Sequence, residues 1–111
     1  MNDFKVVFPS GYNVDYYDDN IDLNIIIPTG SVFFSTFFTI LNIKNLIEKG
    51  NSSYFWSTDM IIVKDLKKET IKNVIRSIID DEYLESTCTN IGKVHDVFPK
   101  VKSYFDILSD I

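Results

Sequence analysis

Two apolar runs separated by a proline–glycine turn most constrain the fold of this chain. In the first run, Ile21–Ile27, the odd positions are apolar while positions 22 and 24 are polar, which is the period of two of a half-buried strand. Pro28-Thr29-Gly30 follows, with Pro suited to the first central position of a tight turn and Gly able to adopt a positive φ. The second run, Ser31–Ile40, is apolar on both faces, as in a central strand. The sequence therefore predicts a β-hairpin whose second strand lies inside a sheet.

Helical spacing is clearest over Glu69–Asp81. Five apolar side chains there fall at i, i+3, i+4, i+7 and i+8: Ile71, Val74, Ile75, Ile78 and Ile79. A shorter helix is expected after Asn42, which is a good N-cap, with Gly50 as its left-handed stop. It would have about two turns, too few to persist without packing on the sheet. A last helix is expected from Pro99, with Val101, Tyr104, Phe105 and Leu108 at helical spacing.

Two further strands are expected, at Phe4–Phe8 and Tyr54–Val63, whereas residues 83–92 fit a short helix or irregular chain equally well. The order is then strand, hairpin, helix, strand, helix, helix. Tight hairpin connections favour antiparallel pairing. We therefore expect a single α+β domain over residues 1–111, with a mainly antiparallel sheet of about four strands and helices packed on one face.

Composition narrows the class of protein. The 111 residues hold 16 acids against 11 bases, for a net charge of −5, which argues against direct nucleic-acid binding. No apolar run is long enough to span a membrane, and the first residues lack the pattern of a secretion signal. A single cysteine, Cys88, suits a reducing compartment. We therefore expect a cytoplasmic protein with no membrane association.

The negative charge is concentrated near the N-terminus. The first 30 residues carry five acids against one lysine, while the remaining residues nearly balance. The acids lie among tyrosines, and the candidate contacts are Asp15, Tyr16, Tyr17, Asp18, Asp19 and Asp22. Clustered carboxylates attract a cationic partner, and tyrosines add rigid contact area. The pattern indicates either a surface that binds a basic partner or a solvated loop; its spacing does not match a calcium-binding EF-hand loop.

Other residues could carry function. A second acidic cluster, Asp80, Asp81, Glu82 and Glu85, lies near the end of the long expected helix, where acids oppose the helix dipole. Lys68, Lys72 and Arg76 form a stripe on that helix that could meet an acidic group or simply face solvent. Within Tyr54–Val63, the aromatics 54–56 must alternate between faces, so they either pack in the core or include an exposed anchor such as Trp56.

Catalytic chemistry is poorly supported. His95 has no Cys or His at metal-ligand spacing, and a pairing with Cys88 would need contacts that the sequence does not show. We therefore assign no catalytic residues, no metal ligands and no cofactor, and we expect a binding protein rather than an enzyme.

Three segments carry a resemblance to a known family: residues 37–43, residues 54–63 and the helix that ends near Ile79. In this order they resemble small bacterial immunity proteins of polymorphic and contact-dependent toxin systems. The resemblance covers about residues 21–91 and so excludes most of the acidic segment. It implies a protein that binds a cognate toxin domain stoichiometrically and blocks it. A basic toxin, such as a nuclease, would suit the charge of this chain. The alternative is a structural or regulatory subunit that self-associates as a homo-oligomer.

Overall fold

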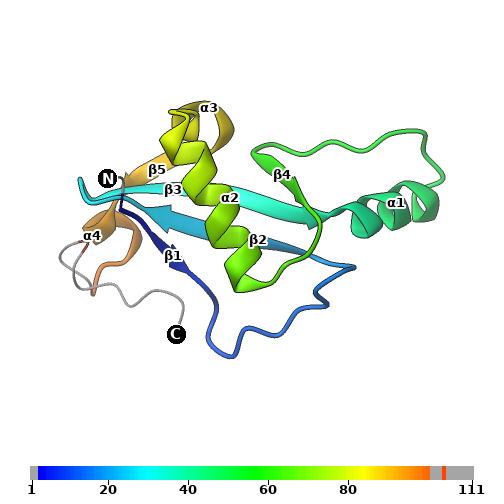
Figure 1. Cartoon of the computed structure of the whole chain (residues 1–111), viewed down its shortest axis with the longest axis horizontal. Coiled ribbons are helices and arrows are strands. Elements are labelled where there is room, and N and C mark those ends of the chain that lie inside the picture. The colour runs from blue at the N-terminus through cyan, green and yellow to red at the C-terminus, as the bar shows by residue number, and fades with distance from the viewer. Residues whose placement is uncertain (1–2, 101–103, 105–111) are drawn as a thin grey trace.

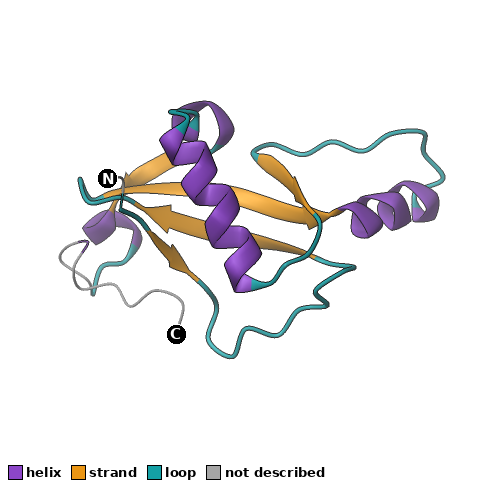
Figure 2. Ribbon diagram, in the orientation of Figure 1, coloured by secondary structure: helices purple, strands orange, loops and turns teal. Residues whose placement is uncertain are grey.

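The computed structural model describes residues 3–100 and Tyr104. Five strands form one sheet: β1 (Lys5–Val7), β2 (Asn20–Ile26), β3 (Ser31–Thr39), β4 (Met60–Val63) and β5 (Thr89–Lys93). Four helices accompany it: α1 (Ile40–Lys49), α2 (Lys68–Asp80), α3 (Leu84–Thr87) and α4 (Val94–Val97). Figures 1 and 2 show α2 lying across one face of the sheet. The predicted α+β class is confirmed.

The predicted hairpin forms the centre of the sheet. β2 and β3 pair antiparallel from Asn20 opposite Phe38 to Ile26 opposite Val32. In the turn between them, the N–H of Gly30 donates to the carbonyl of Ile27 (2.9 Å), and Gly30 has a φ of +89°. A residue with a side chain would be strained in that conformation. The turn therefore forms as the Pro-Thr-Gly sequence predicts.

Strand β3 is the central strand of the sheet, as expected. One edge pairs along its length with β2; the other is shared between β5, antiparallel to residues 31–34, and β4, parallel to residues 36–39. The sheet thus has five strands, one pairing of which is parallel. The sequence did not predict β5, because Thr89–Lys93 is a largely exposed strand without apolar alternation.

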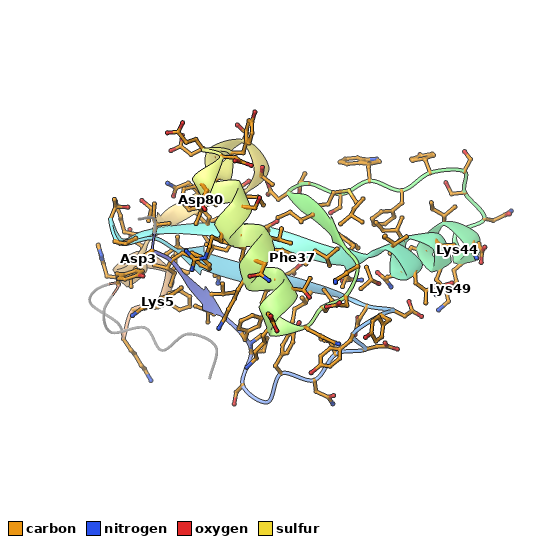
Figure 3. The ribbon with its side chains drawn as sticks, viewed as in Figure 1. Asp3, Lys5, Phe37, Lys44, Lys49 and Asp80 are labelled. Atoms are coloured by element: carbon orange, nitrogen blue, oxygen red, sulfur yellow. The ribbon has the colours of Figure 1, made fainter. Side chains whose placement is uncertain are left out.

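The main core lies between the sheet and α2. Phe37 is fully buried at its centre with Ile71 and Ile75 of α2 (Figure 3). A second, smaller cluster contains Ile26 and Val32, whose side chains point to the opposite face, with Val94 of α4 and Tyr104. The expectation of helices on one face is therefore wrong, since α4 packs on the other. The helix expected from Pro99 lies largely outside the described residues.

Helix α1 differs from the prediction at both ends. Its N-cap is Thr39, whose hydroxyl accepts the N–H of Asn42 (3.2 Å), so Asn42 lies inside the first turn. Gly50 has an ordinary φ of −79°, and the left-handed residue is Asn51. No α1 residue is fully buried, and the helix extends beyond the sheet instead of packing on its face (Figure 1). Helix α1 therefore lacks the packing on a face of the sheet that the sequence predicts for it.

The strand predicted over Tyr54–Val63 is mostly irregular. Only Met60–Val63 pairs with β3, and residues 51–59 form a connection that ends with Asp59 at a φ of +52°. A left-handed residue of this kind interrupts the extended backbone. Of the predicted strand, only the last four residues therefore form β4. No helix of the described chain combines the length and apolarity needed to cross a membrane.

Candidate protein-binding surface

The acidic segment, defined as residues 15–22, is anchored to two distant parts of the fold. The carbonyl of Tyr16 accepts the N–H of Leu66 (2.8 Å), and the carbonyl of Asp19 accepts the N–H of Thr39 (3.1 Å). Just before the segment, the hydroxyl of Tyr12 donates to the carbonyl of Leu66 (2.8 Å). These bonds attach the segment to the start of α2 and the end of β3, so it is an ordered loop.

Carboxylates inside the segment also order its backbone. Asp15 accepts the N–H groups of Tyr17 (3.0 Å) and Asp18 (3.2 Å) through one oxygen, and Asp19 accepts the N–H of Asp15 (3.2 Å). Two other acids bond side chains: Asp18 accepts the amide of Asn45 (3.0 Å), and Asp22 accepts the hydroxyl of Thr36 (2.7 Å). Asp15 and Asp22 are exposed, and Asp18 and Asp19 are half-buried. The acids are thus fixed in place while their charge still faces solvent.

The tyrosines of the segment divide into exposed and anchoring residues. Tyr16 and Tyr17 are exposed, and the ammonium of Lys67 lies 5.7 Å from the Tyr17 ring. A hydrogen bond with Tyr17 raises the pKa of Lys67. Tyr12 is half-buried, and burial, with Tyr16 and Asp19 nearby, raises its pKa to about 12. Tyr12 therefore anchors the loop as a neutral phenol, while Tyr16 and Tyr17 are available for contact.

The second acidic cluster lies at the other end of α2. Asp80, Asp81, Glu82 and Glu85 are all exposed around the turn between α2 and α3, where Glu82 has a φ of +63°. The acidic segment contacts Leu66, just before α2 begins, whereas Figure 3 shows Asp80 at the far end of the helix. A helix of 13 residues is about 20 Å long. The two acidic groups therefore do not form one surface.

The basic stripe on α2 packs against the N-terminal segment. The Lys68 ammonium lies 5.0 Å from the Phe8 ring and 5.8 Å from the Tyr12 ring, and the Arg76 guanidinium lies 4.9 Å from the Phe4 ring. These contacts hold the chain before β2 against α2. Lys68 and Arg76 therefore contact aromatic rings of the N-terminal segment, while Arg76 stays exposed to solvent.

His95 and Cys88, the residues considered for catalysis, each have another partner. The imidazole of His95 is exposed and pairs with its neighbour Asp96 (3.3 Å), whereas the Cys88 thiol is buried and hydrogen-bonds to Ser35. A depression of about 500 Å³ beside α2 contains the Asp65 carboxylate, but Thr70 and the N–H of Lys67 already bond it, and the Thr70 bond lowers its pKa. Within the described residues, no group of three or more His, Cys, Asp or Glu could hold a metal ion.

Burial raises the pKa of the Cys88 thiol to about 11, which leads to a testable pH dependence. Above about pH 9 the unfolded chain loses the thiol proton while the folded chain retains it, so the free energy of unfolding falls as pH rises from 9 to 11. Urea denaturation at several alkaline pH values measures this fall, and Cys88→Ala should make it shallower. An identical pH dependence in that variant would contradict the assignment.

Three large apolar side chains between residues 54 and 62 are exposed, a feature that the sequence predicts only in part. Phe55 packs edge-on against Phe38, with ring centroids 5.3 Å apart, while Tyr54 and Trp56 are exposed. Ile62 of β4 is exposed as well. Of the two alternatives for Trp56, core packing is wrong and exposure is correct. The aromatic triplet was the signal, since three neighbouring aromatics cannot all face one core.

Comparison of the chain with protein-family models, with curated proteins and with solved structures found no match. Function therefore has to be inferred from the chain's own residues.

Proposed function

We propose that this chain is a non-enzymatic binding protein that neutralises a cognate toxin domain by stoichiometric occlusion, with the acidic segment as the contact surface. The observation that carries the proposal is the order of this segment: hydrogen bonds to Leu66 and Thr39 hold it while Tyr16 and Tyr17 stay exposed. An interface that is already ordered loses little conformational entropy on binding. The resemblance to immunity proteins supplies the class of partner.

Charge favours a basic partner. The acidic segment carries four carboxylates. The nearby Lys67 ammonium hydrogen-bonds to Tyr17. Such a surface accelerates encounter with a cationic protein and weakens as salt screens it. Toxins that cleave nucleic acid carry basic surfaces for their substrate, so a nuclease domain is the class of toxin that this chain would suit best.

The proposal is tested by co-expression. The product of the gene adjacent to that of this chain is induced in a susceptible host, with and without this chain, and growth is followed. We expect arrest with the neighbour alone, rescue with both, and co-purification of a 1:1 complex. A neighbour that is harmless alone, or that arrests growth equally in both cases, would contradict the proposal.

A further inference from the structure

A second exposed surface lies beside the acidic segment, because Ile40 directly follows Thr39, whose N–H donates to the carbonyl of Asp19. We define the aromatic patch as Ile40, Tyr54, Trp56 and Ile62, whose side chains are 64%, 66%, 70% and 56% exposed. Three of its members lie next to the contact between the Phe38 and Phe55 rings. Tyr54 and Trp56 are the chain neighbours of Phe55, and Ile62 is opposite Phe38 in the sheet. Ile40 follows Phe38 by two residues at the end of β3. The patch is therefore held by an ordered aromatic pair.

The aromatic half of the patch is free of charged side chains, whereas Ile40 and Ile62 have Lys44 and Lys64 near them in the chain. Residues 50–58, which supply both of its aromatic rings, contain no charged side chain in a protein with 27. The nearest acid in sequence, Asp59, accepts a hydrogen bond from the hydroxyl of Thr89 (2.6 Å). Asn, Ser, Tyr and Trp, which make up most of this stretch, are the residues that rigid protein-binding surfaces favour. The patch has the composition of an interface but lacks any feature that would select a basic partner.

The exposed area is of the size that a modest dimer needs. With about 150–250 Å² for each aromatic side chain and somewhat less for each isoleucine, the four exposed fractions sum to on the order of 400 Å² of apolar surface. Interfaces are about 60% apolar and bury about 600–1,000 Å² on each partner. The patch would therefore supply the apolar centre of an interface near the lower end of that range.

We infer that the aromatic patch joins two copies of this chain in a two-fold symmetric dimer. Each copy carries a net charge of −5, so two copies repel one another least where charged side chains are few, and residues 50–58 provide such a region. In a two-fold interface, each patch meets an identical patch, so no complementary charge is required. This self-association goes beyond the proposed function, and its contact residues are not those of the acidic segment.

The chain contains its own reporter of this contact, because Trp56 is its only tryptophan. Sedimentation and Trp56 emission are measured on the protein alone, from about 1 to about 300 µM, the range in which a weak dimer dissociates. We expect the mass to rise to that of a dimer and the emission to shift to the blue as Trp56 leaves water. Added salt should strengthen association, since it screens repulsion between like charges, whereas it should weaken a complex with a basic toxin.

Two variants test the location of the contact. Ile62→Lys and Tyr54→Ser should each raise the dimer dissociation constant at least about tenfold, the usual effect of removing a central contact. Tyr83→Ser is the matched control, because Tyr83 is equally exposed but lies beyond the far end of α2. A monomer at every concentration, or a dimer weakened as much by Tyr83→Ser, would overturn the inference. Neither result bears on toxin binding, so the two proposals can fail separately.

Discussion

Phe37→Ala is expected to lower the free energy of unfolding by about 3–5 kcal/mol, the largest effect of any single change considered for this protein. Phe37 is fully buried in the central strand β3, in the cluster that also contains Ile71 and Ile75 of α2. Removing the ring loses the favourable free energy of burying it away from water. It also leaves a cavity between β3 and α2 that the surrounding side chains fill only in part. Urea denaturation followed by far-ultraviolet circular dichroism measures the loss.

Tyr83→Ala is the control for this prediction, because it also removes an aromatic ring, but from an exposed position. Its effect should remain within about 0.5 kcal/mol, as is usual for surface substitutions. A loss below about 1 kcal/mol for Phe37→Ala would contradict the packing of α2 on β3.

The second large effect concerns association with the proposed toxin partner. Replacing Asp15 and Asp18 together by Asn should slow association about tenfold at low salt and flatten its dependence on ionic strength. Asn retains an oxygen that can accept the bonds from Tyr17, Asp18 and Asn45, so the change removes charge and preserves the loop. Asp19 is left intact because its two oxygens accept the N–H groups of Asp15 and Asn20.

The matched control is Asp80→Asn with Asp81→Asn, which makes the same change in net charge at the far end of α2. Stopped-flow association over a series of salt concentrations compares the two pairs. Equal slowing by both would mean that overall charge, and not the acidic segment, governs binding. No slowing by the Asp15 and Asp18 pair would remove the segment from the interface.

The central hairpin and α2 could be predicted from the sequence because each depends on short-range patterns. Alternation, a Pro-Thr-Gly turn and isoleucines at helical spacing are all read within about a dozen residues. The start of α1 illustrates a limit: Thr39 and Asn42 are both good N-caps, and the choice depends on where β3 ceases to pair. β5 shows another limit, since Thr89–Lys93 becomes a strand only because β3 has a free edge there.

The candidate site also combines features that the sequence shows with features that depend on distant parts of the chain. Clustering of acids and tyrosines at residues 15–22 was visible in the sequence, but its order depends on Leu66 and Thr39, which are distant along the chain. Trp56 is exposed in an irregular connection that ends at the left-handed Asp59, so β4 begins only at Met60. Periodicity alone could not separate an extended loop from a strand in residues 54–59. Long-range hydrogen bonds and backbone conformation decide both features.

Amide hydrogen exchange of the chain, free and in the 1:1 complex, shows whether the acidic segment contacts the proposed toxin partner. In the free protein, the N–H groups of Tyr17 and Asp18 bond only an exposed carboxylate, so they should exchange rapidly. We predict that complex formation slows exchange at residues 15–22. Protection confined to residues 80–85 or 54–62, with residues 15–22 unchanged, would contradict the account.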